Sequence, residues 1–531
     1  MREIYRGAWL LAILSGILQV LIFPLPDVYP LCWVATAPLL LALLRARNPK
    51  YVRVAPGLSQ PLLPASPLQG FFLGYVSGVI WYAGTCFWVY HTMHLYGGLS
   101  ASVALGVLVL FCLYLALYHG LFGFLTAVLA AARPNGVRRA LFFSPFLWVA
   151  VELARTRISA FPWDLLGTAQ IDNISLNRVA TITGVYGLSF EIMLVNTVFA
   201  AAFMVPSEKR KLILIEALIA AAALQLIALI KPAPLKTDHS ALLLQEDIPI
   251  LEPSAWTAQY YEGTLADLSR RSTSLPARSA KPDLIVWPES PAPFYVNDPK
   301  FNSAVAAVAQ QDEAYVVAGS LGTHTPQGQN RPPELYNSAA LMSPQGAWVA
   351  RYDKIHLVPF GEYVPFKALL TFAQKLTREV GEFGRGESRA PLSAGSAKLG
   401  VFICYESVFP DEVRQFALNG AQVLINISND GWYGNTGAFA QHLNQARMRA
   451  VENHRWLLRS TNTGLTASID PYGRIVTRAP REVRTTLEAP YALLSGTTFY
   501  TRYGDWFAYG CAIIFIGALL ARFRAPATRE I

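Results

Sequence analysis

Long and short apolar segments divide this chain into two kinds of region. Eight segments are long enough, or nearly so, for the roughly 20 residues that a helix needs to cross a bilayer. They are 8–24, 29–44, 69–90, 99–132, 140–154, 178–206, 211–230 and 503–521. The pattern predicts a multi-pass α-helical membrane domain with eight spans, seven within residues 1–231 and the last within residues 503–531. Segment 99–132 is overlong, so it is either one long tilted helix or a span with an interfacial turn.

Between residues 232 and 502 the apolar runs become short and alternate with helix-like stretches. The runs 241–245, 284–287, 315–318, 338–342, 399–403, 422–427 and 465–469 favour strands. The stretches 257–271, 301–311, 410–419 and 438–453 favour helices. Strands that alternate with helices predict an α/β domain, with a layered sheet and helices outside it.

Composition supports the membrane assignment. The chain is 53% hydrophobic and only 15% charged, whereas a soluble domain has about 25% charged residues. The net charge of +9 is not gathered into a basic stripe with interleaved aromatic residues. We therefore expect no nucleic-acid partner.

The positions of the cations orient the predicted spans. If the spans alternate, most Lys and Arg residues near their ends fall on one side, which the positive-inside rule makes cytoplasmic. These residues are Arg2, Arg6, Arg45, Arg47, Lys50, Arg53, Arg133, Arg138, Arg139, Lys209, Arg210, Lys211, Arg522, Arg524 and Arg529. A loop at 155–177 breaks the pattern with Arg155 and Arg157. Both termini should then be cytoplasmic, and residues 232–502 should lie on the outer side.

Cys404 is the one cysteine outside a membrane-length apolar segment, and it ends the strand-like run that begins at Leu399. A thiol at the end of a strand is placed to act as a nucleophile. The simpler alternative is that Cys404 is a small buried hydrophobe.

Two further strand ends carry polar groups. Glu289 ends the run 284–289, and Lys354 stands in an otherwise apolar extended run. Glu289 could instead cap a helix, and Lys354 could extend to solvent. Together with Cys404 they form a plausible catalytic set, with Glu289 as base and Lys354 stabilising the thiolate and an oxyanion beside a backbone N–H after Cys404. His356 is the alternative base, ranked second because the sequence shows no acid to orient it.

These residues resemble the Glu-Lys-Cys triad of the nitrilase (carbon–nitrogen hydrolase) superfamily, whose fold is an αββα sandwich. Seven spans before such a domain and one after it are similar to the apolipoprotein N-acyltransferases of bacterial inner membranes. Further similar stretches are Phe161–Trp163, Gly184–Phe190, Pro359–Pro365, Ser428–Gly434, Gln441–His442 and Thr461–Gly464.

The resemblance implies a ping-pong acyl transfer through a Cys404 thioester. The donor would be a phospholipid, typically phosphatidylethanolamine, and the acceptor the N-terminal amine of a diacylated apolipoprotein. It also implies supporting or substrate-binding roles for Glu362, Tyr405, Glu406 and Trp256, and a periplasmic catalytic domain. No Gly-rich phosphate loop or metal-ligand spacing occurs, so we expect no cofactor, and nothing in the sequence demands a partner subunit.

Two alternatives remain open at this level. A membrane-tethered nitrilase-type amidase would use water as the second nucleophile, and a transporter or scaffold would carry an inactive outer domain. Two local hypotheses also follow: residues 359–386 form either a mobile lid or a plain surface loop, and Phe161–Trp163 form either a lipid-facing floor or an interfacial anchor.

Overall fold

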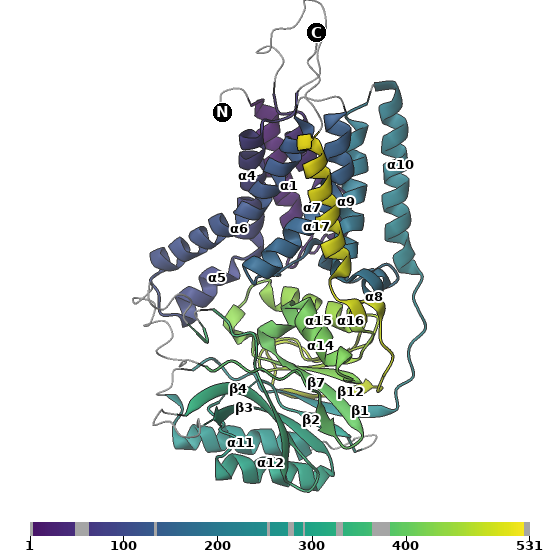
Figure 1. Ribbon diagram of the computed structural model, residues 1–531. Helices are drawn as coiled ribbons and strands as arrows, with labels where there is room; N and C mark the ends of the chain where they lie inside the picture. Colours follow the sequence, from purple (N-terminus) through teal and green to yellow (C-terminus); the bar gives the residue numbers. More distant parts are fainter. Residues whose placement is uncertain are drawn as a thin grey trace, which may run out of the picture.

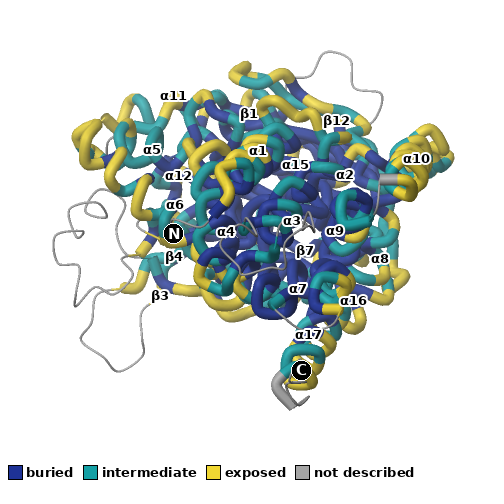
Figure 2. Tube along the Cα trace, turned by 90° about the horizontal axis from the view of Figure 1, so that it is seen from above, coloured by how far each residue is buried: buried dark blue, intermediate teal, exposed yellow. Residues whose placement is uncertain are grey.

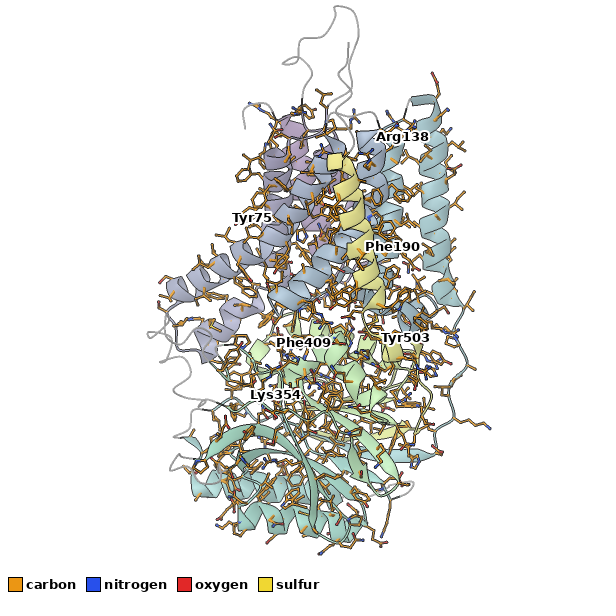
Figure 3. The ribbon with its side chains drawn as sticks, viewed as in Figure 1. Tyr75, Arg138, Phe190, Lys354, Phe409 and Tyr503 are labelled. Atoms are coloured by element: carbon orange, nitrogen blue, oxygen red, sulfur yellow. The ribbon has the colours of Figure 1, made fainter. Side chains whose placement is uncertain are left out.

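The computed structural model describes residues 4–47, 63–131, 135–205, 207–251, 255–273, 281–289, 292–324, 333–359, 361–363 and 383–524, and the following account concerns these. A bundle of helices stands on one side of an α/β domain (Figure 1). The start of the first helix and the end of the last lie at the end of the bundle that faces away from the sheets. Arg138 lies at the same end (Figure 3).

Apolar segments from both ends of the chain build the bundle. Its longer helices are α1 (Arg6–Leu21), α3 (Ala37–Leu44), α4 (Pro67–Thr85), α6 (Ala101–Ala130), α7 (Gly136–Ile158), α9 (Val185–Ala202), α10 (Ser207–Leu226) and α17 (Trp506–Arg524). Shorter helices are α2 (Cys32–Ala35), α5 (Trp88–His91), α8 (Ala180–Thr183) and α16 (Phe499–Tyr503). Seen along the bundle, buried residues fill the centre while α10 and α17 carry exposed ones (Figure 2).

Fewer helices than predicted have the full length of a membrane span. Within the described residues, α6, α9 and Glu208–Leu229 are long and apolar enough, and α4 with Trp88–Tyr96 forms a fourth candidate bent by 53°. The apolar helices Arg6–Leu21, Tyr29–Leu44 and Trp506–Arg522 are shorter. The 16 residues of α1 rise only about 24 Å, against a hydrocarbon core of about 30 Å. Eight full-length spans are therefore not confirmed.

Three predicted segments differ from the observed helices in instructive ways. The overlong segment 99–132 contains one continuous helix of 30 residues, α6, which is the first of the two alternatives predicted for it. The short segment 140–154 is part of the 23-residue α7, so Arg155 and Arg157 end a helix and the prediction that they lie in a loop was wrong. Segment 178–206 is interrupted at Gly184, whose φ of +66° is incompatible with a right-handed helix, and α9 starts only after it.

Helices α4 and α6 pack closely because glycines line their contact. A Cβ atom built on Gly74 would lie 2.2 Å from the backbone oxygen of His119, and one on Gly123 would lie 2.1 Å from that of Gly70. Gly70 and Gly74 are four residues apart and therefore share a face of α4. This is the small-residue spacing that lets membrane helices approach backbone to backbone.

The α/β domain contains two six-stranded sheets within the described residues. One has the order β12-β1-β2-β3-β4-β5 and the other β11-β10-β9-β8-β7-β6. The first sheet comprises β1 (His239–Gln245), β2 (Leu284–Val286), β3 (Tyr315–His324), β4 (Glu334–Met342), β5 (Trp348–Asp353) and β12 (Thr485–Tyr491). The second comprises β6 (Leu392–Ala394), β7 (Ala397–Ile403), β8 (Val423–Ser428), β9 (Leu457–Thr461), β10 (Ala467–Ile469) and β11 (Ile475–Arg478).

Helices cover the outer faces of the two sheets, as the alternating pattern predicted. Helices α11 (Ala258–Thr273) and α12 (Pro299–Asp312) lie on the face away from the bundle, and α14 (Pro410–Leu418) and α15 (Ala438–Asn453) lie between the sheets and the bundle (Figure 1). The Ser460 hydroxyl on β9 donates to the carbonyls of Leu244 and Val286 on the opposite sheet, at 2.7 and 3.1 Å.

Each predicted strand run and helical stretch of this region contains or overlaps an observed element, but some strands escaped prediction. Strand β9 is buried along its whole length although it contains Arg459, Ser460 and Thr461. These polar side chains bond inside the protein, so a search for apolar runs does not find the strand.

Candidate active site

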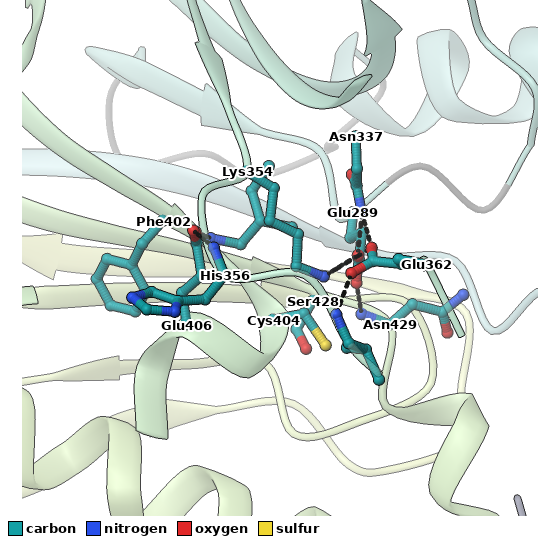
Figure 4. A network of polar contacts seen from close by, with 12 residues as sticks. Glu289, Asn337, Lys354, His356, Glu362, Phe402, Cys404, Glu406, Ser428 and Asn429 are labelled. Carbon is teal, nitrogen blue, oxygen red and sulfur yellow. Dashed lines mark hydrogen bonds and ion pairs between the residues drawn. The ribbon is translucent and has the colours of Figure 1, made fainter. Parts of the chain in front are cut away.

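Glu289, Lys354 and Cys404 lie where strands of the two sheets end. Glu289 comes three residues after β2, Lys354 directly follows β5, and Cys404 directly follows β7. All three are buried, with 7%, 1% and 6% of their surface exposed. Figure 4 shows the Lys354 ammonium and the Cys404 sulfur directed to the same space, beside the carboxylate of Glu289.

The carboxylate of Glu289 is held by donors from both sheets. Its Oε1 accepts a hydrogen bond from Asn337 Nδ2 at 2.7 Å, and Asn337 belongs to β4. Its Oε2 accepts from the backbone N–H of Asn429 at 2.7 Å, just after β8. Two fixed donors leave the carboxylate little freedom to rotate, so its orientation is set before any substrate arrives.

Lys354 is a buried cation between two carboxylates. Its Nζ lies 2.9 Å from Glu362 Oε1 and 3.5 Å from Glu289 Oε1. Burial alone would lower the pKa of Lys354, but Glu362 and Glu289 outweigh burial and raise it well above its usual value. Glu362 is fixed in turn by the Val358 N–H at 2.8 Å and by Asn337 Nδ2 at 2.8 Å. The lysine therefore keeps a permanent positive charge in the site.

Cys404 has an unusual backbone and a protonated thiol. Its φ of +49° is in the left-handed region, which costs a non-glycine residue about 1–3 kcal/mol. Burial raises the pKa of the thiol and Glu289 raises it further, while Lys354 opposes them. The resting group is therefore a thiol, and it needs a base to become a nucleophile.

Glu406 ties the Cys404 turn to the Lys354 segment. Its Oε1 accepts from the Tyr352 hydroxyl and from the backbone N–H groups of Ile355 and His356, at 2.7, 2.6 and 3.0 Å. Its Oε2 accepts from the Ile403 N–H at 2.6 Å. Since Lys354 and Cys404 each adjoin a residue that Glu406 holds, this buried carboxylate fixes the distance between the cation and the thiol.

Comparison with known proteins places this architecture in a family. Residues 226–494 match the carbon-nitrogen hydrolase family, and residues 15–198 match the apolipoprotein N-acyltransferase N-terminal domain. The apolipoprotein N-acyltransferase of Geobacter metallireducens is 37% identical over 515 residues, which cover 95% of this chain and 93% of that protein. That of Methylococcus capsulatus is 32% identical over 535 residues, covering 98% and 97%.

The chain belongs to the apolipoprotein N-acyltransferase family. The resemblance drawn from the sequence is thus confirmed. Among solved structures, a carbon-nitrogen hydrolase from Helicobacter pylori G27 aligns with 48% of this chain and 89% of its own, at 18% identity and a TM-score of 0.34.

Tyr405, the residue that follows Cys404, contacts the helical bundle. The Tyr405 hydroxyl donates to the carbonyl of Ala160, just beyond α7, at 3.1 Å. Trp163 is 1% exposed, and its ring lies over that of His442 with centroids 5.9 Å apart. Trp163 Nε1 also donates to Gln441 at 2.8 Å. The Phe161–Trp163 stretch is therefore packed between bundle and sandwich, and Trp163 itself is neither a lipid-facing floor nor an interfacial anchor.

The side chains of two other sequence candidates make their contacts outside this group. Trp256 packs edge-on against Tyr260, and among the described residues no hydrogen bond or ring contact joins it to Glu289, Lys354 or Cys404. The His356 ring stacks on Phe409, and its Nε2 lies 3.0 Å from Glu412 Oε2. An orienting acid for His356 does exist, contrary to expectation, because α14 brings Glu412 from 56 residues away.

Sequence reasoning did not assign roles to Asn337, Asn429 or His442. The stretches that contain Asn429 and His442 were noticed as similar to the family, which was the available signal, while Asn337 stands in a strand without any motif.

Most of the proposed lid, residues 360 and 364–382, lies outside the described residues.

Proposed function

We propose that this protein transfers a fatty acyl chain from a phospholipid to the N-terminal amine of a diacylglyceryl-cysteine apolipoprotein, through a thioester on Cys404. The observation that carries the proposal is the buried Glu289–Lys354–Cys404 group, joined through Tyr405 to the bundle. A nucleophile at the boundary of an apolar helical bundle is placed to meet acyl chains that reside in a bilayer.

In the first half-reaction Glu289 accepts the proton of the Cys404 thiol, and the thiolate sulfur attacks the carbonyl carbon of the phospholipid ester. The negative charge that forms on the carbonyl oxygen is stabilised by the Lys354 ammonium and the Tyr405 N–H. When the intermediate collapses, the carbon–oxygen ester bond breaks. The leaving lysophospholipid oxygen takes up the proton that Glu289 received from the thiol, and the acyl chain remains on sulfur.

In the second half-reaction the neutral α-amine of the apolipoprotein attacks the thioester carbonyl. Glu289 accepts a proton from the attacking nitrogen, and the same two donors stabilise the oxyanion. The carbon–sulfur bond breaks as the amide forms, and Glu289 returns the proton to the thiolate. Glu362 lies 2.9 Å from the Lys354 ammonium, so the cation keeps a carboxylate partner when Glu289 is protonated and neutral.

Water is the competitor that separates this function from the amidase alternative. The three proposed reacting residues are at most 7% exposed, which limits hydrolysis of the thioester before the amine arrives. Among the described residues around Cys404, nothing favours water as the second nucleophile.

The wider assignments belong to the same proposal. We divide the chain into a membrane domain at 1–231, a periplasmic catalytic domain at 232–502 and a C-terminal membrane helix with a cytoplasmic tail at 503–531. The protein would lie in the bacterial inner membrane with both termini cytoplasmic, act as a monomer and use phosphatidylethanolamine as donor. The cation distribution supports this orientation, and the common end of α1 and α17 agrees with it.

Mass spectrometry of the protein after incubation with sn-1-labelled phosphatidylethanolamine tests the function. We expect one acyl adduct on Cys404 that persists until a diacylated lipopeptide is added and is then transferred to it. Cys404→Ser should abolish transfer, and Glu289→Gln should prevent adduct formation. Rapid release of free fatty acid without lipopeptide would instead support a hydrolase, and absence of any wild-type adduct would contradict both functions.

A further inference from the structure

Three buried polar residues that the mechanism above does not use form a connected group that contacts the Cys404 carbonyl through His442. His442 on α15, Asp430 after β8 and Arg459 on β9 are 0%, 2% and 0% exposed. His442 Nε2 lies 3.0 Å from the Cys404 carbonyl oxygen, and its Nδ1 lies 2.9 Å from Asp430 Oδ1. Because a carbonyl oxygen can only accept, Nε2 carries a hydrogen and donates it.

Arg459 anchors this arrangement from the strand two positions away from β7. Its Nη2 donates to Asp430 Oδ2 at 2.7 Å and lies 3.0 Å from His442 Nδ1. Its Nη1 bonds to the side-chain oxygen of Asn426, whose Nδ2 donates to the Phe402 carbonyl at 3.2 Å. One arginine is thus connected to the backbone carbonyls on both sides of Ile403.

The carbonyl that His442 holds belongs to the same peptide unit as the Tyr405 N–H. A peptide unit is planar and trans, so its C=O and N–H point in opposite directions and turn together. Fixing the Cys404 carbonyl therefore fixes the direction of the Tyr405 N–H. It also opposes relaxation of Cys404 out of its left-handed backbone conformation at φ +49°.

We propose that His442, held by Asp430 and Arg459, is a positioning residue that aims the Tyr405 N–H at the oxyanion formed in both half-reactions. This inference deepens the proposed function and rests on it. Loss of His442 should lower the rate of acylation of Cys404 rather than the affinity for phospholipid. The reason is that the Tyr405 N–H, which His442 positions, stabilises the oxyanion of the transition state and not the bound phospholipid.

Two amide variants separate this role from simple packing. His442→Gln carries an amide nitrogen that reaches the position of Nε2, whereas the amide of His442→Asn reaches only that of Nδ1. Single-turnover acylation by phosphatidylethanolamine should fall about 30- to 100-fold in His442→Asn, with KM little changed, since removal of an oxyanion donor costs about 100- to 1000-fold. In His442→Gln it should stay within about 5-fold of wild type, given a donor near the same position.

Alkylation of Cys404 by iodoacetamide provides the contrasting readout on the same preparations. Alkylation displaces iodide at a saturated carbon and forms no oxyanion. The alkylation rate should therefore stay within about 3-fold of wild type in both variants. Arg459→Lys should reproduce the pattern of His442→Asn more weakly. Gln445→Leu, one turn further along α15, is the control for disturbance of the helix.

Three outcomes would overturn the proposal: wild-type acylation by His442→Asn, equal losses in the Gln and Asn variants, or a parallel fall of acylation and alkylation. A different result would contradict the proposed function itself. Acyl transfer by Cys404→Ala would exclude a thioester on Cys404, and His442 would then have no oxyanion to act on.

Discussion

At the scale of single residues, burial and charge act on the Cys404 thiol in opposite directions. Burial and the Glu289 carboxylate raise its pKa, and the Lys354 ammonium lowers it. The balance keeps the sulfur protonated at rest, which protects it from indiscriminate chemistry, since the thiolate is the reactive form. In the proposed mechanism, the thiol therefore needs Glu289 as its base.

The pH dependence of Cys404 alkylation tests this balance with variants of opposite sign. Glu289→Gln removes a neighbouring anion, so the thiolate is stabilised and the midpoint of alkylation against pH should move down. Lys354→Met removes the cation, and the midpoint should move up. The rate can be followed by mass spectrometry of the Cys404 peptide, and a shift of either variant in the other direction would contradict the electrostatic account.

At the scale of elements, the close approach of α4 and α6 requires glycine at particular positions. A side chain at Gly74 would meet the backbone of α6, which cannot move aside as a flexible side chain would. By contrast, a Cβ atom on Gly106, also in α6, would meet nothing within 4 Å. Two glycines in the same helix pair thus have different structural roles.

Gly74→Val should lower the thermal unfolding temperature, with a cost of about 1–3 kcal/mol or more from overpacking. Gly106→Ala is the matched control, and it should be neutral or stabilising by less than about 1 kcal/mol, because alanine favours a helix. Tryptophan fluorescence during heating in detergent measures both. Equal effects would mean that the close approach of the two helices does not matter.

At the scale of the whole molecule, one ionic cluster joins the bundle to the sandwich. Arg157, in the last turn of α7, lies 2.6 Å from Asp505 before α17 and 3.3 Å from Asp411 on α14. The Asp505 side chain is 1% exposed and also accepts from the Tyr500 hydroxyl at 2.9 Å. The cluster therefore connects an early helix, the catalytic domain and the last helix.

Arg157→Met should destabilise the protein by about 2 kcal/mol, because it leaves the buried Asp505 carboxylate without its cation. The expected cost is smaller than for a fully buried ion pair, since the Arg157 side chain is 38% exposed. Adding Asp505→Asn should recover part of the loss by removing the uncompensated charge. Unfolding of the single and double variants in denaturant measures this coupling. Additive losses would show that the two residues do not stabilise one another.

The amino-acid sequence by itself determined the two-part architecture and the positions of most helices, and it pointed to the three residues that we propose as reacting groups. These follow from local information: apolar periodicity, chain length, and a carboxylate, a lysine and a thiol at strand ends. The same information misjudged the number of full-length spans, because the length of a helix depends on where the chain breaks, as at Gly184. It also overlooked β9, because a buried strand with polar side chains has no run of apolar residues.

Tertiary structure alone decided which residues surround the triad. Asn337 and Asn429 orient Glu289, and His442 reaches the Cys404 carbonyl from 38 positions along the chain. Local sequence does not predict these contacts, since they join residues of one sheet, of two sheets, or of a strand end and a helix that are far apart in sequence. Local sequence specifies what a residue can do chemically, whereas the fold specifies which partners hold it in place.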